Sequence, residues 1–138
     1  IENVQKNAGK QFHIETDFPG TPLPVTADKM IMNNIVINLL ENAIKYSGEE
    51  PVIRVNAGID DNGLSFSISD NGIGIPASEQ SHIFEPFFRS KNDYVASLPG
   101  MGLGLSYVKM AVEAHRGTVD VLSKPNYGTT ITVKIPRQ

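Results

Sequence analysis

A glycine-rich segment, GMGLG at 100–104, directly precedes a stretch with helical periodicity at 105–115. Glycines at such a position leave the amide groups of the helix N-terminus free to point at an anion, which the helix dipole also favours. The alternative is a flexible hinge, since short glycine patterns occur in many settings. The segment lacks the Gly-Lys-Ser/Thr ending of a Walker loop, and it does not follow a first strand as a dinucleotide fingerprint would.

The tripeptide Asp-Asn-Gly occurs twice, at 61–63 and at 70–72. The first copy lies between two alternating segments, 51–59 and 64–70, which is typical of a β-hairpin. No alternating strand follows the second copy, so a hairpin does not explain it. There Asp70 ends a buried-looking strand, and the glycines that follow would let a flat ligand or a phosphate approach the backbone. A loop that only needs positive φ is the alternative.

The segment 33–47 combines helical spacing of its apolar residues with a stripe of amides. Asn34, Asn38 and Asn42 are four residues apart and therefore lie along one side of the predicted helix. Asn is a mediocre helix former because its amide competes for backbone groups. A column of amides that ends in Lys-Tyr at 45–46 therefore calls for a reason other than helix formation.

The composition indicates one packed domain. The chain has 138 residues, of which 40% are hydrophobic and 20% charged, and its net charge of −3 is weak evidence against a nucleic-acid partner. It contains no cysteine, which excludes disulfides and thiolate metal sites. No apolar run approaches a membrane span, and the first residues lack the apolar region of a signal peptide. Since the chain does not begin with methionine, we expect a fragment of a larger protein.

The periodicities predict an α/β protein. The predicted elements are a helix tail at 1–10, a strand at 11–18, a helix capped by Thr26 or Asp28 and ending near Tyr46, the hairpin at 51–70, helices at 77–83 and 106–115, and strands at 118–123 and 129–136. This order predicts a two-layer α/β sandwich, with helices packed on one face of a mixed, mainly antiparallel sheet. The irregular segment 85–103 fits a compact domain only if it is functional, for example as a lid.

Several motifs, in this order, resemble those of the ATP-binding catalytic domain of bacterial sensor histidine kinases. That family is a branch of the superfamily of gyrase B, the mismatch-repair and heat-shock chaperone ATPases and the mitochondrial dehydrogenase kinases. NLLENAIKY at 38–46 is similar to the N box, DNGIG at 70–74 to the first glycine box, IFEPFFR at 83–89 to the F box, GMGLGL at 100–105 to the second glycine box, and GTT at 128–130 to the short last box. The resemblance covers about residues 5 to 136 and implies a single domain, 1–138, with the Bergerat-type ATP-binding fold.

The resemblance gives the amide stripe a role. Asn42 would ligate Mg²⁺, a hard cation that prefers oxygen ligands and keeps several waters. Asn38 would lie beside it, one helical turn earlier. Lys45 would reach a phosphate as a point charge, and Tyr46 would lie near the adenine or ribose. Asn34 has no family role, and a solvated or helix-packing amide explains it.

The resemblance also assigns the base-binding and lid residues. Asp70 would accept the adenine amino proton, and a buried partner of this kind rejects bases that lack the group. Gly72 and Gly74 would let the purine approach. Arg89 would contact phosphate from an ATP lid at about 85–103, unless it is a solvated surface residue. The implied ATP-binding residues are Asn42, Lys45, Tyr46, Asp70, Gly72, Gly74, Ile75, Arg89, Gly100, Met101, Gly102, Leu103, Gly104, Leu105 and Thr130.

Two features of the lid depart from the family pattern. Met101 stands where many relatives have Thr or Ser, so a hydroxyl contact to phosphate is missing, and Pro99 would stiffen the lid.

The phenylalanines of the F box would anchor the lid, contact a neighbouring domain or simply pack in the core; these are Phe84, Phe87 and Phe88.

The implied function is binding of Mg-ATP and donation of its γ-phosphoryl group to a histidine, as part of a two-component system. Such transfer depends mostly on positioning and charge neutralisation, for which Asn38, Glu41 and Lys45 are the catalytic candidates. His13, His82 and His115 do not lie in a His-Glu or His-Asp pattern typical of the acceptor helix. The acceptor is therefore expected on an upstream dimerisation domain, with a response regulator receiver domain taking the phosphoryl group next.

Other functions of the same superfamily stay open. A hydrolytic ATPase would place a Glu general base at the position of Asn38, and an amide cannot take a proton from water. Glu41 is a substitute base, but it is displaced by about 60° around the helix. A protein serine kinase and a nucleotide-sensing module are further alternatives. We expect a monomeric cytoplasmic fragment of a homodimeric protein, with anchoring of the full-length protein in the inner membrane left open.

Overall fold

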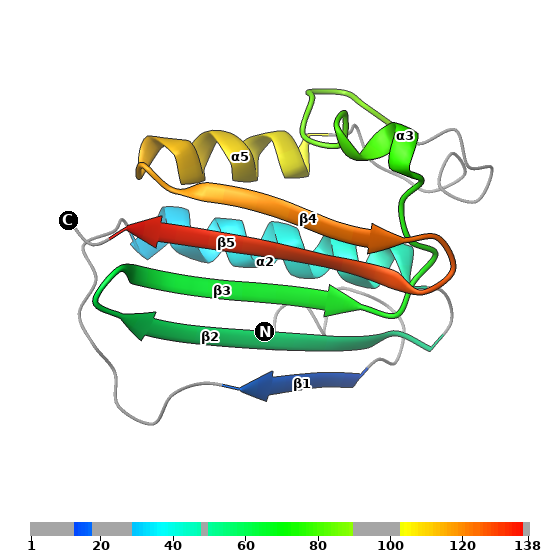
Figure 1. The fold of residues 1–138 in the computed structure, drawn as a ribbon, viewed down its shortest axis with the longest axis horizontal. Helices are drawn as coiled ribbons and strands as arrows, with labels where there is room; N and C mark the ends of the chain where they lie inside the picture. Colours follow the sequence, from blue (N-terminus) through cyan, green and yellow to red (C-terminus); the bar gives the residue numbers. More distant parts are fainter. Residues whose placement is uncertain (1–12, 18–28, 48–49, 90–102, 137–138) are drawn as a thin grey trace.

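The computed structural model describes residues 13–17, 29–47, 50–89 and 103–136. Within these ranges a five-stranded sheet carries helices on one face (Figure 1). The elements in chain order are β1 (His13–Asp17), α2 (Lys29–Tyr46), β2 (Val52–Asp60), β3 (Gly63–Asp70), α3 (Ala77–Gln80), α5 (Gly104–Ala114), β4 (Thr118–Lys124) and β5 (Gly128–Pro136). The predicted helix tail at 1–10, the capping residues Thr26 and Asp28, and positions 90–102 of the predicted lid lie outside the described residues.

The sheet has the strand order β1-β2-β3-β5-β4. β1 runs parallel to β2, and the remaining neighbours are antiparallel. Parallel neighbours need a long crossover connection, and here the connection from β1 to β2 contains α2. The predicted mixed, mainly antiparallel sheet with helices on one face is therefore confirmed.

The core lies between the sheet and the helices α2 and α5. In Figure 1, α2 passes behind the strands and α5 lies above the edge strand β4. Alternate residues of the central strands point to this core, as the period of a half-buried strand requires. Its buried residues are Ile35, Leu39, Leu40, Ala43 and Ile44 of α2, Val108, Ala111 and Val112 of α5, and Ile53, Val55, Phe66, Ile68, Ile131, Val133 and Ile135 of the sheet. The apolar face predicted for the long helix is the face that packs here.

The opposite face of the sheet carries short polar side chains on β3 and β5. Ser69 and Thr130 are neighbours across these strands, and their hydroxyl oxygens lie 2.8 Å apart. No helix of the described chain covers this face (Figure 1).

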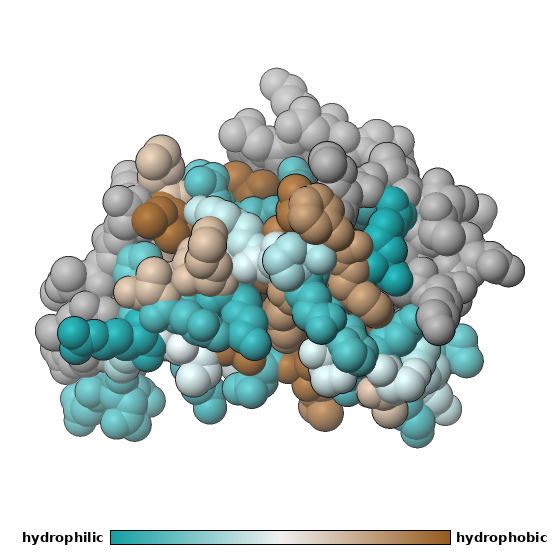
Figure 2. Space-filling model, turned by 90° about the horizontal axis from the view of Figure 1, so that it is seen from above, coloured by the Kyte–Doolittle hydropathy of each residue, from teal (hydrophilic) through white to brown (hydrophobic). Residues whose placement is uncertain are grey.

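Seen from above, much of the described surface is hydrophilic, with hydrophobic residues in small groups between polar ones (Figure 2).

The two Asp-Asn-Gly copies behave as the sequence predicts. The first forms the β2–β3 hairpin, in which the Asp60 carboxylate accepts hydrogen bonds from the backbone N–H groups of Asn62 and Gly63 at 2.8 and 3.2 Å. The second ends β3, where Asp70 accepts a hydrogen bond from Gly72 at 2.8 Å and no strand follows directly.

The short helix predicted at 77–83 is shorter in the structure. α3 ends at Gln80, and the chain continues in single turns, with the His82 N–H bonded to the Glu79 carbonyl and the Glu85 N–H bonded to the His82 carbonyl. These bonds span three residues, which does not propagate an α-helix. In the described part of the chain, no helix has the length and hydrophobicity needed to cross a membrane.

Candidate ATP-binding site

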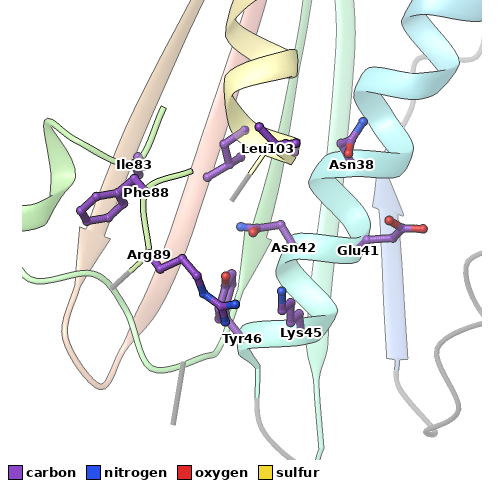
Figure 3. A pocket seen from close by; sticks show the side chains of 11 residues that line it. Asn38, Glu41, Asn42, Lys45, Tyr46, Ile83, Phe88, Arg89 and Leu103 are labelled. Carbon is purple, nitrogen blue, oxygen red and sulfur yellow. The ribbon is translucent and has the colours of Figure 1, made fainter. Parts of the chain in front are cut away.

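A cavity of about 250 Å³, here called the helix-side cavity, lies between α2, the segment 83–89 and the start of α5 (Figure 3). Its lining residues are Asn38, Glu41, Asn42, Lys45, Tyr46, Ile83, Phe88, Arg89, Leu103, Gly104 and Leu105. Figure 3 shows the Asn42 side chain directed into the space between α2 and the segment of Phe88 and Arg89. The structure thus brings the predicted N box, F box and second glycine box together around one space.

The amide stripe divides into members with different environments. Asn34 is exposed, whereas Asn38 and Asn42 are half-buried in the cavity wall. The Asn38 side-chain nitrogen donates to the Asn34 backbone carbonyl at 2.8 Å, which leaves its oxygen toward the start of α5. A Cβ added at Gly104 would lie 3.1 Å from that oxygen, so the glycine allows α5 to begin close to α2.

Positive charge gathers at the C-terminal end of α2. Burial lowers the pKa of the Lys45 ammonium below its ordinary value, and the nearby guanidinium of Arg89 lowers it further. The Lys45 nitrogen also lies 5.6 Å from the centre of the Tyr46 ring, and burial raises the pKa of that phenol. Lys45 and Arg89 repel each other within one cavity, and the negative charge of a bound polyphosphate would offset this repulsion.

Glu41 is placed differently from the other predicted catalytic residues. It contributes to the lining of the helix-side cavity, but its side chain is exposed. In Figure 3 it points to the side of α2 away from Asn42.

A second cavity, the sheet-side cavity, adjoins the first, and residues such as Asn42, Tyr46 and Arg89 line both. Its lining residues are Asn42, Tyr46, Asp70, Ile73, Gly74, Ile75, Glu79, Ile83, Phe88, Arg89, Leu105 and Thr129. Branched aliphatic side chains supply most of the apolar wall, and Asp70 supplies a carboxylate. This mixture suits a flat aromatic ring with a polar edge.

Burial raises the pKa of the Asp70 carboxyl to about 6, although hydrogen bonds from the backbone of Gly72 and Thr129 act in the opposite direction. A pKa of about 6 leaves most of the Asp70 carboxyl ionised at pH 7, so that it accepts hydrogen bonds inside a partly apolar cavity. A ligand group that donates a hydrogen bond to the Asp70 carboxylate would replace the water that burial in the cavity removes.

Gly72 and Gly74 are required by close backbone contacts that the sequence alone does not reveal. A Cβ at Gly72 would clash with the backbone carbonyl of Tyr46, and one at Gly74 would clash with the backbone carbonyl of Lys124. Gly74 also has a φ of +72°, which favours glycine. The glycines therefore allow the loop to approach the protein's own backbone, and only Gly74 of the two lines the cavity.

The prediction of Thr130 as an ATP-binding residue has to be corrected, because its neighbour Thr129 occupies the lining of the candidate site. The structure directs its side chain to the face of the sheet opposite the helices, where it contacts Ser69, and it does not line either cavity. Its neighbour Thr129 is buried and lines the sheet-side cavity beside Asp70. Side chains alternate along a strand, so a one-residue shift changes the face. The burial parity of Ile131, Val133 and Ile135 in the sequence was the signal that could have identified Thr129.

Comparison with known proteins identifies the family. The family described as histidine kinase-, DNA gyrase B-, and HSP90-like ATPase matches residues 27–138. The chain belongs to this family. An uncharacterized sensor-like histidine kinase of Rhizobium meliloti is 40% identical over 112 residues, which are 81% of this chain and 21% of that protein. The chain thus spans about a fifth of the length of that relative.

Solved structures of histidine kinases are similar to this chain. A mycobacterial sensor histidine kinase, MprB, has a TM-score of 0.84 and 34% identity, covering 99% of this chain and 90% of that one. Full-length ShkA in complex with AMPPNP has a TM-score of 0.78 and 27% identity, covering 98% of this chain and 27% of that one. The chain is an ATP-binding catalytic domain of the sensor histidine kinase type, with the Bergerat fold that the motifs predict.

The described residues of the domain do not form a metal site from acidic, histidine or cysteine side chains alone. No group of three or more His, Cys, Asp or Glu side chains there could hold a metal ion by itself. Asn42 fits a shared ion, because its amide lies in the cavity close to Lys45 and Arg89, where phosphate oxygens would supply further ligands. The donor set is therefore consistent with an ion that arrives together with the nucleotide.

The second glycine box is only partly described. Leu103, Gly104 and Leu105 lie in the helix-side cavity, as predicted. Gly100, Met101 and Gly102 lie outside the described residues, so the lid at about 85–103 stays a prediction.

The F-box phenylalanines separate into different roles. Phe88 lines both cavities, Phe87 is 65% exposed, and Phe84 lies beneath the Lys109 ammonium, which is 5.8 Å from its ring centre. Four further lining residues were not predicted from the sequence, where only the burial parity at Thr129 offered a signal; these are Ile73, Glu79, Ile83 and Thr129.

Proposed function

We propose that this domain binds Mg-ATP and donates the γ-phosphoryl group to a histidine on a dimerisation domain located upstream in the longer protein. The observation that carries the proposal is the pair of adjoining cavities, one with the half-buried Asp70 carboxylate and the other with the Lys45 ammonium, while Arg89 lines both. An adenine nucleotide has the same order of groups, with an amino-bearing base at one end and anionic phosphates at the other.

The proposed roles follow from where the side chains lie. Asp70 accepts a hydrogen bond from the adenine amino group, and Tyr46 and the aliphatic residues of the sheet-side cavity pack against the base. Lys45 and Arg89 neutralise phosphate charge. Asn42 supplies an amide oxygen for Mg²⁺, which when bound would neutralise charge on the phosphates. The protein's contribution to catalysis is then positioning and electrostatic stabilisation.

The residue beside Asn42 favours transfer over hydrolysis. Asn38 lies in the cavity one turn before Asn42, where a hydrolytic relative would need a general base, and its amide cannot take a proton from water. Glu41 is exposed and directed away from the Asn42 side chain (Figure 3). An attacking water would therefore find no suitably placed carboxylate among the described residues of the helix-side cavity.

The two histidines whose side chains are described have local partners. The His82 ring nitrogen lies 3.0 Å from a carboxylate oxygen of Glu85, and the ring of His82 stacks on Phe88 with centres 5.9 Å apart. The His115 Nδ1 lies 2.8 Å from the Ala111 carbonyl oxygen. Neither environment is that of an acceptor on a helix of a dimerisation domain, which supports an acceptor elsewhere.

The proposal extends to the longer protein. We infer a homodimer held by the upstream domain, which would contain the acceptor histidine, and a response regulator receiver domain as the next partner. The requirement for ATP supports a cytoplasmic location for this domain, whether or not the longer protein is anchored in the inner membrane. The isolated fragment would then be a monomer.

The test combines nucleotide binding with phosphoryl transfer. The chain should bind Mg-ATP in calorimetry and should stay unlabelled when incubated alone with γ-labelled ATP. Label should appear when a dimerisation domain with its acceptor histidine is supplied. Acid-labile label on His13, His82 or His115 would contradict the proposal, as would a failure to bind the nucleotide.

A further inference from the structure

A hydroxyl group on β4 joins the loop after Asp70 to the sheet. Ser123 accepts a hydrogen bond at its Oγ from the Ile75 backbone N–H, 2.8 Å away. The same oxygen lies 3.0 Å from the Gly128 carbonyl oxygen and 2.7 Å from the Thr129 hydroxyl. Ser123 therefore makes three polar contacts with one side chain, and two of the three partner residues, Ile75 and Thr129, line the sheet-side cavity.

The number of hydrogens decides the direction of these bonds. A serine hydroxyl has one hydrogen to donate and two lone pairs that accept. The Ile75 N–H can only donate, so it takes one lone pair of Ser123. The Gly128 carbonyl can only accept, so it takes the single hydrogen of Ser123. All three contacts are satisfied only if the Thr129 hydroxyl donates its own hydrogen to the second lone pair.

This direction fixes what Thr129 offers to a ligand. With its one hydrogen given to Ser123, the Thr129 hydroxyl has only lone pairs left for a ligand in the sheet-side cavity, which Thr129 lines. Asp70 is the residue opposite Thr129 across β3 and β5, and its ionised carboxylate also only accepts. The two neighbouring side chains of the sheet wall thus share the same hydrogen-bonding character.

We propose that Ser123 is a positioning residue, which makes the sheet wall of the nucleotide site accept hydrogen bonds only and so selects adenine over hypoxanthine. The inference rests on the proposed function, because it assumes that a purine base occupies the sheet-side cavity. Adenine carries a 6-amino group that donates, whereas hypoxanthine carries a 6-keto oxygen that would face acceptors. A buried polar group left without its partner costs binding free energy.

The loop does not depend on Ser123 alone, so the selection can be tested apart from loop attachment. The Gln80 side-chain nitrogen donates to the Ile75 carbonyl at 2.9 Å and to the Ser123 backbone carbonyl at 3.1 Å. The Asn126 backbone N–H donates to the Ile73 carbonyl at 2.7 Å. These bonds remain in a Ser123→Ala variant, which removes the hydroxyl and releases the hydrogen of Thr129 toward the cavity.

The experiment compares Kd values for Mg-ATP and Mg-ITP, measured by calorimetry on the whole chain. Ser123→Ala should lower the preference for ATP over ITP by roughly five- to tenfold, the effect of one hydrogen bond. Ser123→Thr keeps the hydroxyl and should keep the wild-type ratio. The matched control is Ser69→Ala, which breaks the equivalent hydroxyl pair with Thr130 on the opposite face of the sheet and should leave the ratio unchanged.

A second pair of variants covers the case in which Ser123→Ala does not fold. Thr129→Val removes the acceptor in the cavity and should lower the ATP preference, whereas Thr130→Val on the opposite face should not. A wild-type ratio in folded Ser123→Ala, or in folded Thr129→Val, would overturn the inference. A wild-type domain that binds ATP and ITP equally well would also overturn it, while leaving the proposed function in place. Failure of the wild type to bind either nucleotide would overturn the proposed function itself.

Discussion

The backbone N–H of Ile73 donates a hydrogen bond to the carbonyl oxygen of Tyr46 across 3.2 Å. This bond joins the loop after β3 to the last residue of α2, so the helix wall and the sheet wall of the nucleotide site are connected through backbone atoms. Gly72 lies against the same carbonyl, without space for a Cβ. The distance between the Asn42 and Asp70 sides of the site therefore depends on a residue that has no side chain.

Gly72→Ala should destabilise the domain and weaken nucleotide binding, because the added methyl would push the loop away from Tyr46. Overpacking of this kind costs about 1–3 kcal/mol in the free energy of unfolding. Denaturant unfolding and ATP calorimetry measure the two effects. Gly58→Ala is the matched control, since a Cβ there meets nothing within 4 Å. Equal stability of the two variants would show that the close approach at Gly72 does not matter.

Asp70→Asn should weaken ATP binding, because it replaces a charged acceptor with an amide in the sheet-side cavity. A hydrogen bond to a charged group is worth about 1.5–3 kcal/mol, which sets the expected loss in calorimetry. The variant should also discriminate less between adenine and other bases. Unchanged affinity in a folded variant would place the base elsewhere.

The pH dependence of Asp70 has opposite signs for folding and for binding. Its pKa is raised from the ordinary value of 3.8 to about 6, so the folded chain binds this proton more tightly than the unfolded chain. The stability that this provides is fully present below about pH 4 and is lost as the pH rises through about 6. Across that window Asp70→Asn should gain stability relative to the wild type, by roughly 2–3 kcal/mol.

ATP affinity should change in the other direction, since the ionised carboxylate is the acceptor. Wild-type affinity should therefore rise with pH through about 6, and this step should be absent in Asp70→Asn. Calorimetry and denaturant unfolding at several pH values check both signs. A wild-type domain and an Asp70→Asn variant with parallel pH profiles would contradict the raised pKa.

Asn42→Ala should act on the metal more than on the base. Loss of the amide oxygen from the helix-side cavity should reduce the Mg²⁺ enhancement of ATP binding and abolish transfer to a supplied acceptor domain. Asn34→Ala removes an exposed amide from the same stripe and is the control, because its backbone carbonyl still accepts the bond from Asn38. Normal Mg²⁺ dependence in both assays would rule out the metal role of Asn42.

Arg89→Gln should weaken binding of ATP far more than binding of adenosine, because the guanidinium is proposed to contact phosphate. A charge-assisted hydrogen bond is worth about 1.5–3 kcal/mol for ATP. The pKa of Lys45 should rise in this variant, since Arg89 lowers it in the wild type, and NMR titration of the lysine measures the change. Lys109→Gln, an exposed cation outside both cavities, should affect neither ligand. A similar loss for adenosine and ATP would remove Arg89 from the phosphate site.

The sequence allowed the helix α2, the hairpin and the order of the motifs to be predicted, because each depends on local periodicity or on turn residues. Contacts between distant segments could not be predicted in this way. Ser123 and Ile75 are 48 positions apart, and their hydrogen bond exists only once the sheet has formed. The assignment of Thr130 in place of Thr129 failed for a related reason, since the face of a strand residue follows from its register with β3.

The Asp70 carboxylate lines the sheet-side cavity, whereas the Lys45 ammonium lines only the helix-side cavity, and this separation has a consequence for inhibitor chemistry. A neutral amino-substituted heterocycle that fills only the sheet-side cavity would compete with adenine nucleotides without any negative charge of its own. Molecules of that kind diffuse through lipid bilayers, whereas mimics of the triphosphate do not. The position of Asp70 thus makes the half of the site that needs no phosphate the more accessible target for a drug.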